Sequence, residues 1–260
     1  MELSRTGALV RAVASRYREM GLWRTFRLGV RKLLSMIRAL GSSKDLHPFD
    51  LKYGTETSGV IESWSLDLPQ KMIAHAARYQ TAIVEVYLEI LNSLPITHQE
   101  FVFIDLGSGK GRALLLASCF PFKQIIGVEL SPRLHEIACE NIRRYRDGSQ
   151  RCHKILSICE DATEYEIPKE NVVFYMFNPF DDEVMSSMIL NIERSLRSFP
   201  RRMYIMYLKP VCRHLFDRTD WLRTVKATDR YVIYETKQAY YSADQTRENG
   251  SAIQPGRGTR

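Results

Sequence analysis

The chain has 260 residues, of which 45% are hydrophobic and 26% charged, a composition typical of a globular protein with a sizeable core. It contains no run of about 18 apolar residues, so we expect no transmembrane helix. The five cysteines include no C-x-x-C pair, which argues against a zinc site or a disulfide framework and favours a cytoplasmic protein without bound metal.

The positive charge is concentrated at the start of the chain. The net charge is +7, and residues 1–43 alone hold nine basic and two acidic residues. The remainder is balanced, so the body shows no basic groove of the kind that binds nucleic acid. In the second half of this arm, apolar residues recur at steps of three and four, and the arginines fall on the opposite side, which predicts an amphipathic helix. The apolar stripe consists of Leu22, Phe26, Val30, Leu33, Ile37 and Leu40.

Two interpretations of this helix remain open. It either packs on its own domain, or it lies on an anionic membrane surface and places a cytoplasmic protein at the membrane periphery. In the predicted domain organisation, residues 1–43 form this helical extension and residues 44–241 form the main domain. Residues 242–260 are polar and contain Gly and Pro, so we expect a disordered tail.

The main domain begins with a segment of mixed character. Residues 45–70 contain two prolines and two glycines and predict irregular structure. An apolar face repeated at helical spacing predicts a helix over residues 71–92.

From residue 101 onward, strand-like and helix-like stretches alternate, which predicts an α/β, Rossmann-like, mostly parallel sheet with flanking helices. The expected parallel strands are Phe101–Leu106, Gln124–Glu129, Lys154–Cys159, Val172–Phe177 and Met203–Leu208. The expected helices between them are Arg112–Phe120, Pro132–Tyr145 and Asp182–Ser198. Two last strands, Arg223–Ala227 and Tyr231–Glu235, form a C-terminal antiparallel hairpin that completes a seven-stranded sheet.

The strongest functional signal is the run Asp105-Leu106-Gly107-Ser108-Gly109-Lys110-Gly111, which starts within the first of these strands and leads into a helix. Glycines let a backbone turn tightly and approach a ligand closely, and the start of the helix offers free N–H groups. The run is not a dinucleotide fingerprint, because Arg112 stands at the third glycine position, and its spacing is wrong for a P-loop. We therefore expect a ligand site that includes Asp105, Gly107, Ser108 and Gly109.

Polar residues also follow the next three strands, at the edge where open α/β sheets bind ligands. Glu129 ends the second strand, where a carboxylate can accept both hydroxyls of a ribose. Asp161 follows the third strand, where it can meet the amino group of an adenine. Asn178, Pro179 and Phe180 follow the fourth. Each position also has a structural interpretation: a helix cap for Glu129, a turn cap for Asp161 and core packing for Phe180.

In this order, the motifs of residues 101–210 resemble those of the class I S-adenosylmethionine-dependent methyltransferases. The resemblance implies S-adenosyl-L-methionine as cofactor. Asp105 and the glycines would hold its amino acid end, Glu129 its ribose and Asp161 its adenine. Residues 49–59 resemble a segment of a group of largely uncharacterised bacterial methyltransferases. An aromatic residue near the site, Tyr53 in this segment or Phe180, is expected to contact the sulfonium of the cofactor.

Asn178, Pro179 and Phe180 resemble the Asn-Pro-Pro-Tyr/Phe motif of amino-group methyltransferases, without its second proline. The resemblance implies that these residues position a nitrogen acceptor and that Asn178 also borders the cofactor. The acceptor itself is not identified by the sequence, which is compatible with a protein, a small molecule, a lipid or RNA. Two alternatives to an active enzyme remain: a non-catalytic module that binds S-adenosylmethionine, and a nicotinamide-dependent oxidoreductase, which Arg112 disfavours.

Overall fold

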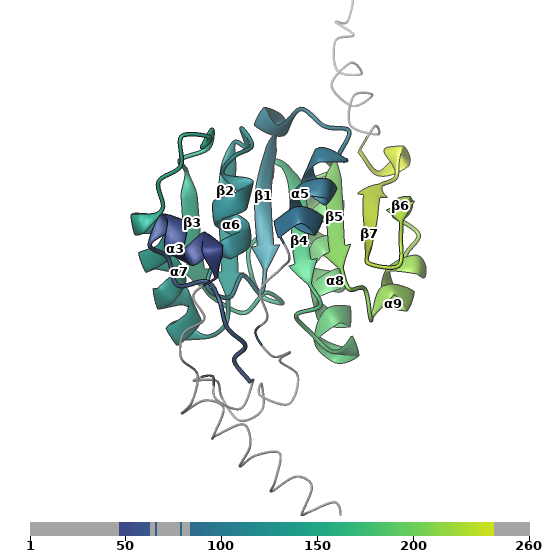
Figure 1. Ribbon diagram of the computed structural model, residues 1–260. Helices are drawn as coiled ribbons and strands as arrows, with labels where there is room; N and C mark the ends of the chain where they lie inside the picture. The colour runs from purple at the N-terminus through teal and green to yellow at the C-terminus, as the bar shows by residue number, and fades with distance from the viewer. Residues whose placement is uncertain (1–46, 63–65, 67–78, 80–83, 242–260) are drawn as a thin grey trace, which may run out of the picture. The chain divides into compact units, whose positions relative to one another are not determined.

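The structure is a computed structural model that describes residues 47–62, 66, 79 and 84–241. The described residues form one twisted sheet with helices packed against both of its faces (Figure 1). The predicted helical extension and the predicted tail lie outside the described residues, so these two predictions and the domain boundaries remain predictions.

The sheet has seven strands in the order β3-β2-β1-β4-β5-β7-β6. The first five run parallel, and β7 pairs antiparallel with both β5 and β6. Each strand boundary lies within one residue of its predicted position, so the predicted fold class is confirmed. The strands are β1 (Phe101–Leu106), β2 (Gln124–Glu129), β3 (Ile155–Cys159), β4 (Asn171–Phe177), β5 (Met203–Leu208), β6 (Leu222–Ala227) and β7 (Tyr231–Thr236).

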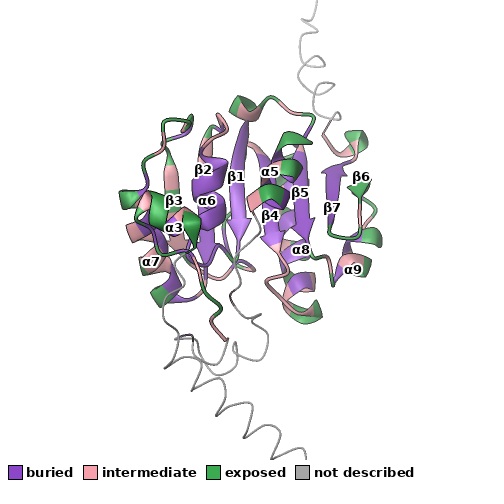
Figure 2. Cartoon of the chain, in the orientation of Figure 1, coloured by how far each residue is buried: buried purple, intermediate pink, exposed green. Residues whose placement is uncertain are grey.

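Side chains of successive strand residues enter two separate hydrophobic layers, one on each face of the sheet. Val102 and Ile104 pack with helices α8 and α9, whereas Phe101 and Phe103 pack with α5 and α6. The central strands are therefore buried on both faces, and only the edge strands β3 and β6 are partly exposed (Figure 2). The helices are α5 (Val84–Asn92), α6 (Arg112–Ala117), α7 (Pro132–Arg144), α8 (Asp182–Ser198) and α9 (Arg213–Asp217).

Side-chain caps explain where the two longest helices begin, just beyond the carboxyl ends of β2 and β4. The hydroxyl of Ser131 accepts a hydrogen bond from the backbone of Leu134 at 3.3 Å, with Pro132 in the first helical position. The carboxylate of Asp181 accepts one from Val184 at 3.1 Å. Both caps satisfy N–H groups that have no partner within the helix, and both predicted starts are confirmed.

The helix predicted over residues 71–92 is wrong at Tyr79. This residue forms an antiparallel bridge with Ile61, in which each backbone donates to the other, at 2.8 and 3.2 Å. The described helical part of the prediction is α5. Apolar spacing is a local signal, and the pairing of Tyr79 with a residue 18 positions earlier overrides it.

The segment predicted to be irregular contains a short helix, α3 (Pro48–Tyr53). Pro48 occupies the first turn, and the ring nitrogen of His47 accepts a hydrogen bond from the backbone of Phe49 at 3.2 Å. Gly54 then ends the helix in the left-handed conformation, at a φ of 65°. The proline and the glycine that predicted a loop therefore mark the two ends of one helical turn and a half.

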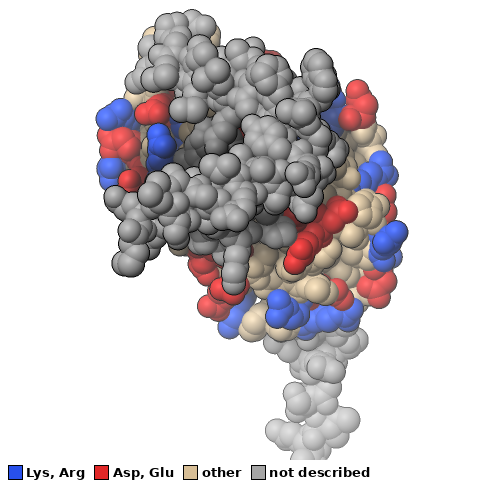
Figure 3. Space-filling view, turned by 90° about the horizontal axis from the view of Figure 1, so that it is seen from below, with Lys and Arg blue, Asp and Glu red and all other residues tan. Residues whose placement is uncertain are grey.

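Charge is mixed around the rim of one face of the described structure. Seen from the carboxyl ends of the parallel strands, lysines and arginines alternate with acidic residues around the visible rim (Figure 3). No helix in the described part of the chain is long and apolar enough to cross a membrane. In the same residues, no group of three or more His, Cys, Asp or Glu side chains is arranged to hold a metal ion.

Candidate functional site

The glycine-rich loop connects β1 to α6 and is tied to the neighbouring strand. The backbone N–H groups of Gly107 and Ser108 both donate to the carbonyl of Val128 in β2, at 2.9 and 3.1 Å. Gly107 and Gly109 have φ values of 79° and 54°, in the left-handed region that side chains with a Cβ rarely adopt. The loop therefore needs glycine at these positions to turn where it does.

The loop after β4 packs directly on this turn. A Cβ atom at position 107 would lie only 2.7 Å from the Cβ of Pro179. The structure thus brings together Gly107 and Pro179, two of the predicted site residues from separate strands. The side chain of Ser108 is buried over Gly127 of β2 and has no hydrogen-bond partner among the described residues, so the contribution of Ser108 to the loop is made by its backbone.

Glu129 closes the loop from the end of β2. It is 7% exposed, and its two carboxylate oxygens accept hydrogen bonds from the backbones of Gly109 at 2.7 Å and Ser131 at 2.8 Å. Burial raises the pKa of Glu129, and the backbone hydrogen bonds oppose that rise. A carboxylate has about four acceptor positions, so about one or two remain for a ligand.

Asp105 is the second buried acid of the site and lies in β1, opposite Gly127 of β2 and Tyr175 of β4. It is 3% exposed, and its carboxylate accepts no hydrogen bond from any described residue. Burial, followed by the charge of Glu129, raises the pKa of Asp105 well above its ordinary value. Two carboxylates close enough to repel, one of them unpaired, define a site suited to a ligand that carries positive charge and hydrogen-bond donors.

Asp161 lies at the same edge, after β3. One of its carboxylate oxygens accepts hydrogen bonds from the backbone and the hydroxyl of Thr163, both at 2.8 Å. The backbone of Glu160 donates to the carbonyl of Glu129 at 3.1 Å, which joins this turn to β2. One carboxylate oxygen of Asp161 therefore caps the turn, as the structural interpretation predicts. The other oxygen is available to a ligand.

Asn178 follows β4 in a conformation that is rare for a residue with a side chain, at a φ of 42°. The hydroxyl of Tyr207 donates to its side-chain oxygen at 3.1 Å and accepts from the backbone of Cys212 at 3.1 Å. Because Tyr207 must donate to Asn178, the amide of Asn178 turns its oxygen toward Tyr207 and its NH₂ group away. Backbone strain of this kind is common at functional sites.

Phe180 and Tyr53 are the predicted site residues whose contacts lie elsewhere. Phe180 is half-buried and packs against the hydrophobic layer around α8, as its structural interpretation predicts. Tyr53 donates to Asp147, and its ring lies 4.6 Å from that of Tyr145. Tyr145 follows the last turn of α7, and its backbone donates to the carbonyl of Asn141 at 2.9 Å. The contacts of Tyr53 are therefore with Asp147 and Tyr145, and not with Gly107 or Gly109.

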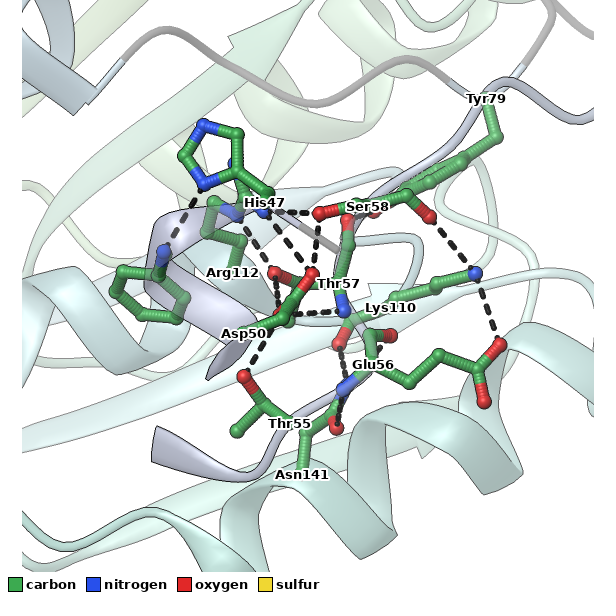
Figure 4. A network of polar contacts seen from close by, with 11 residues as sticks. His47, Asp50, Thr55, Glu56, Thr57, Ser58, Tyr79, Lys110, Arg112 and Asn141 are labelled. Carbon is green, nitrogen blue, oxygen red and sulfur yellow. Dashed lines mark hydrogen bonds and ion pairs between the residues drawn. The ribbon is translucent and has the colours of Figure 1, made fainter. Parts of the chain in front are cut away.

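The segment of residues 47–62, here called the strap, is attached to the glycine loop and to the start of α6 in a way that its sequence did not predict (Figure 4). Asp50, buried in the strap, accepts hydrogen bonds from Thr55, Thr57 and Ser58 and pairs with the guanidinium of Arg112 at 3.4 Å. The sequence indicated only that Arg112 breaks a dinucleotide fingerprint. In the structure, this arginine holds the strap.

Lys110 and Asn141 make the second attachment of the strap. The ammonium of Lys110 lies 3.1 Å from the carboxylate of Glu56 and donates to the carbonyl of Ser58 at 3.0 Å. The amide of Asn141, in α7, bonds to both backbone groups of Glu56 and to the carbonyl of Lys110, at 2.7 to 3.1 Å. Two sequence signals for this attachment were available. Lys110 is a charged residue inside a glycine loop, and Asn141 is an asparagine on the buried face of a helix.

No family model matches the chain, and no curated protein does. Many solved structures match parts of it. A putative S-adenosyl-L-methionine-dependent methyltransferase from Methanococcus maripaludis is 17% identical, with 59% of this chain and 84% of that chain covered and a TM-score of 0.44. An RNA methyltransferase from Salinibacter ruber, solved with S-adenosyl-L-homocysteine, is 18% identical, with 60% of this chain and 92% of that chain covered and a TM-score of 0.41.

The matches are not restricted to one activity. A precorrin 8w decarboxylase from Methanobacterium thermoautotrophicum is 12% identical over 61% of this chain and 92% of that chain, with a TM-score of 0.44. Similarity at this level does not assign a function to the chain. Its fold class is established by its own sheet, and its chemistry has to be inferred from the residues at the carboxyl edge.

Proposed function

We propose that the protein is an S-adenosyl-L-methionine-dependent methyltransferase whose acceptor is not yet identified. The observation that carries this proposal is the pair of buried carboxylates, Asp105 and Glu129, beside the glycine loop. S-adenosylmethionine has a sulfonium and an ammonium, which offset negative charge, and a ribose with two hydroxyl donors. The site fits each of these groups.

The residues that would hold the cofactor follow from their free acceptor positions. Asp105 has no partner among the described residues and would receive the ammonium. Glu129 is bound to Gly109 and Ser131 and would accept the ribose hydroxyls with its remaining lone pairs. The free oxygen of Asp161 would receive the adenine amino group.

The nicotinamide alternative is disfavoured by charge and by shape. A dinucleotide brings a doubly negative pyrophosphate, which two buried carboxylates would repel. The two basic residues at the loop are already paired, Lys110 with Glu56 and Arg112 with Asp50. The sheet also ends in an antiparallel pair, whereas a doubly wound dinucleotide-binding sheet continues with a sixth strand beside the fifth.

When bound, the cofactor supplies an electrophilic methyl group on its sulfonium. What the chain contributes is alignment, which can lower a barrier by about 7–11 kcal/mol when the reacting atoms are held in line. Asn178 and Pro179 lie at the edge of the glycine loop and are the residues that we propose to orient the acceptor. The motif favours a nitrogen acceptor. The free lone pair of the Asn178 oxygen and the carbonyl of Pro179 can both accept hydrogen bonds from an amino group.

Calorimetric titration of the full chain with S-adenosylmethionine, S-adenosylhomocysteine and NAD⁺ tests this proposal. We expect binding of the first two and none of NAD⁺. Binding of NAD⁺ alone, or of none of the three, would overturn it. Transfer of a tritiated methyl group from the cofactor to fractionated lysate then separates an enzyme from a non-catalytic module, because only the enzyme labels an acceptor.

A further inference from the structure

A tyrosine outside the predicted site, Tyr79, lies directly on the glycine loop. A side-chain atom on Gly109 would overlap the ring of Tyr79, so the edge of that ring is in contact with the Cα of Gly109. Gly109 in turn donates to Glu129 at 2.7 Å. The ring therefore stands next to the loop residue that contacts one of the two buried carboxylates.

The strap holds Tyr79 in this position without help from a ligand. Its hydroxyl donates to the carbonyl of Thr57 at 2.5 Å, and its backbone is paired with Ile61. Thr57 is itself fixed, because its backbone N–H donates to Asp50 at 2.9 Å. The ring is thus part of a preformed wall, which is the arrangement that gives a binding contact at the lowest cost in ordering.

Charge beside the ring is already compensated. The ammonium of Lys110 lies 5.7 Å from the centre of the Tyr79 ring, and this ammonium pairs with Glu56 at 3.1 Å. Tyr79 is only half-buried. The ring face carries partial negative charge and attracts cations within about 6 Å.

We propose that Tyr79 is a cofactor-binding residue whose ring contacts the sulfonium of S-adenosylmethionine and favours it over the uncharged product S-adenosylhomocysteine. This inference rests on the proposed function. In the cofactor, the sulfonium is covalently placed between the ribose and the amino acid end. A ligand that joins Glu129 to Asp105 must carry the sulfonium past Gly109, where the ring of Tyr79 lies.

The two aromatic residues that the sequence offered for this contact, Tyr53 and Phe180, are committed elsewhere. Tyr53 donates to Asp147, and Phe180 packs on the hydrophobic layer around α8. Tyr79 is the aromatic side chain that the described structure places against the loop itself.

The test compares the charged and the uncharged ligand. Dissociation constants for S-adenosylmethionine and S-adenosylhomocysteine are measured by calorimetry for the wild type, Tyr79→Phe, Tyr79→Leu and Tyr79→Met. Removing the ring should weaken the binding of S-adenosylmethionine about 3- to 30-fold more than the binding of S-adenosylhomocysteine. Tyr79→Phe keeps the ring and should keep the ratio of the two constants near that of the wild type.

Tyr53→Leu is the matched control, since it removes another half-buried tyrosine ring and should leave the ratio unchanged. The methionine variant retains side-chain volume if the leucine variant proves unstable. Equal weakening of both ligands, or tighter binding by either ring-less variant, would overturn the sulfonium contact. If the variants give such a result while the wild type binds both ligands, this inference is wrong and the proposed function stands. If the wild type binds neither ligand, the proposed function is wrong as well.

Discussion

Asp105 is a residue whose folded environment opposes its charge. Because burial and the charge of Glu129 raise its pKa well above the ordinary value, the folded ligand-free protein holds a proton that the unfolded chain releases. Its contribution to stability is therefore greatest at low pH and is lost as the pH rises from about 4 through the raised pKa. A cationic ligand reverses this preference, because it needs the carboxylate ionised.

We expect Asp105→Asn to raise the melting temperature of the ligand-free protein near neutral pH and to remove this pH dependence. The same change should weaken S-adenosylmethionine about 10- to 100-fold, on the scale of a hydrogen bond between charged groups. Thermal unfolding across pH and calorimetry measure the two effects. Asp229→Asn changes an exposed aspartate in the β6–β7 turn and should alter neither. A variant that is both less stable and unchanged in affinity would contradict the role assigned to Asp105.

Glu129 joins two functions, because the same carboxylate positions Gly109 and is proposed to hold the ribose. We expect Glu129→Ala to weaken S-adenosylmethionine by about 1.5–3 kcal/mol. An analogue that lacks the ribose hydroxyls should bind the wild type more weakly but lose little further affinity in the variant. Calorimetry of both ligands on both proteins gives the coupling energy. Two losses that simply add would show that Glu129 does not contact the ribose.

At the scale of elements, the strap is attached to α6 by an ion pair that is almost fully buried, with Asp50 3% and Arg112 4% exposed. Burial alone would raise the pKa of Asp50, but hydrogen bonds from Ser58, Thr57 and Thr55 hold it below its ordinary value. The stabilisation from this carboxylate is therefore present above about pH 4 and is lost as the pH falls through the lowered pKa.

Removing one partner of such a pair leaves the other charge buried. We expect Asp50→Asn to lower the free energy of unfolding by about 3–5 kcal/mol, measured by urea unfolding at neutral pH. The difference in the free energy of unfolding between this variant and the wild type should become smaller in acid, because the Asp50 carboxylate is then protonated in the wild type. Adding Arg112→Met to this variant should recover part of the loss, because the uncompensated guanidinium is then removed.

The control for this pair is the partly exposed pair of Glu193 and Arg197 on α8, which are four residues apart. Glu193→Gln should cost about 0.5 kcal/mol or less, since water screens an exposed pair. Equal effects of Asp50→Asn and Glu193→Gln would mean that the strap is not held by its buried charge.

For the whole molecule, the distribution of charge leads to a prediction about residues 1–43. These residues carry the entire net charge of +7, and each basic residue near an anionic bilayer contributes about 1 kcal/mol. We expect the full chain to sediment with vesicles rich in anionic lipid at low salt and to be released at high salt. A chain that starts at Lys44 should stay in solution and still bind S-adenosylmethionine.

The packed-helix interpretation of the same residues predicts a different result. The shortened chain would then expose the surface that the apolar stripe covers, and its melting temperature would fall. Measuring melting curves beside vesicle sedimentation distinguishes the two interpretations. Equal vesicle binding by both chains would exclude the membrane interpretation.

Most of the sheet and the grouping of three candidate site residues could be predicted because their signals are local. A hydrophobic strand followed by glycines, or by a capped helix at Ser131, is encoded in neighbouring residues. The carboxyl ends of parallel strands meet at one edge, so Asp105, Glu129 and Asp161 could be grouped without a structure. Tyr53 was assigned by resemblance alone, and the contact with Asp147, 94 residues away, was not predictable from its neighbours.

The sequence by itself determined the seven strands, their direction and the glycine loop, because strand periodicity and glycine conformation are properties of short stretches of chain. Only the tertiary structure decided which side chains surround that loop. Arg112 holds the strap through Asp50, 62 residues earlier in the chain, and Tyr79 lies on Gly109 in place of continuing a helix. Contacts between such distant residues depend on how whole elements pack, and a local pattern of apolar and polar residues does not contain that information.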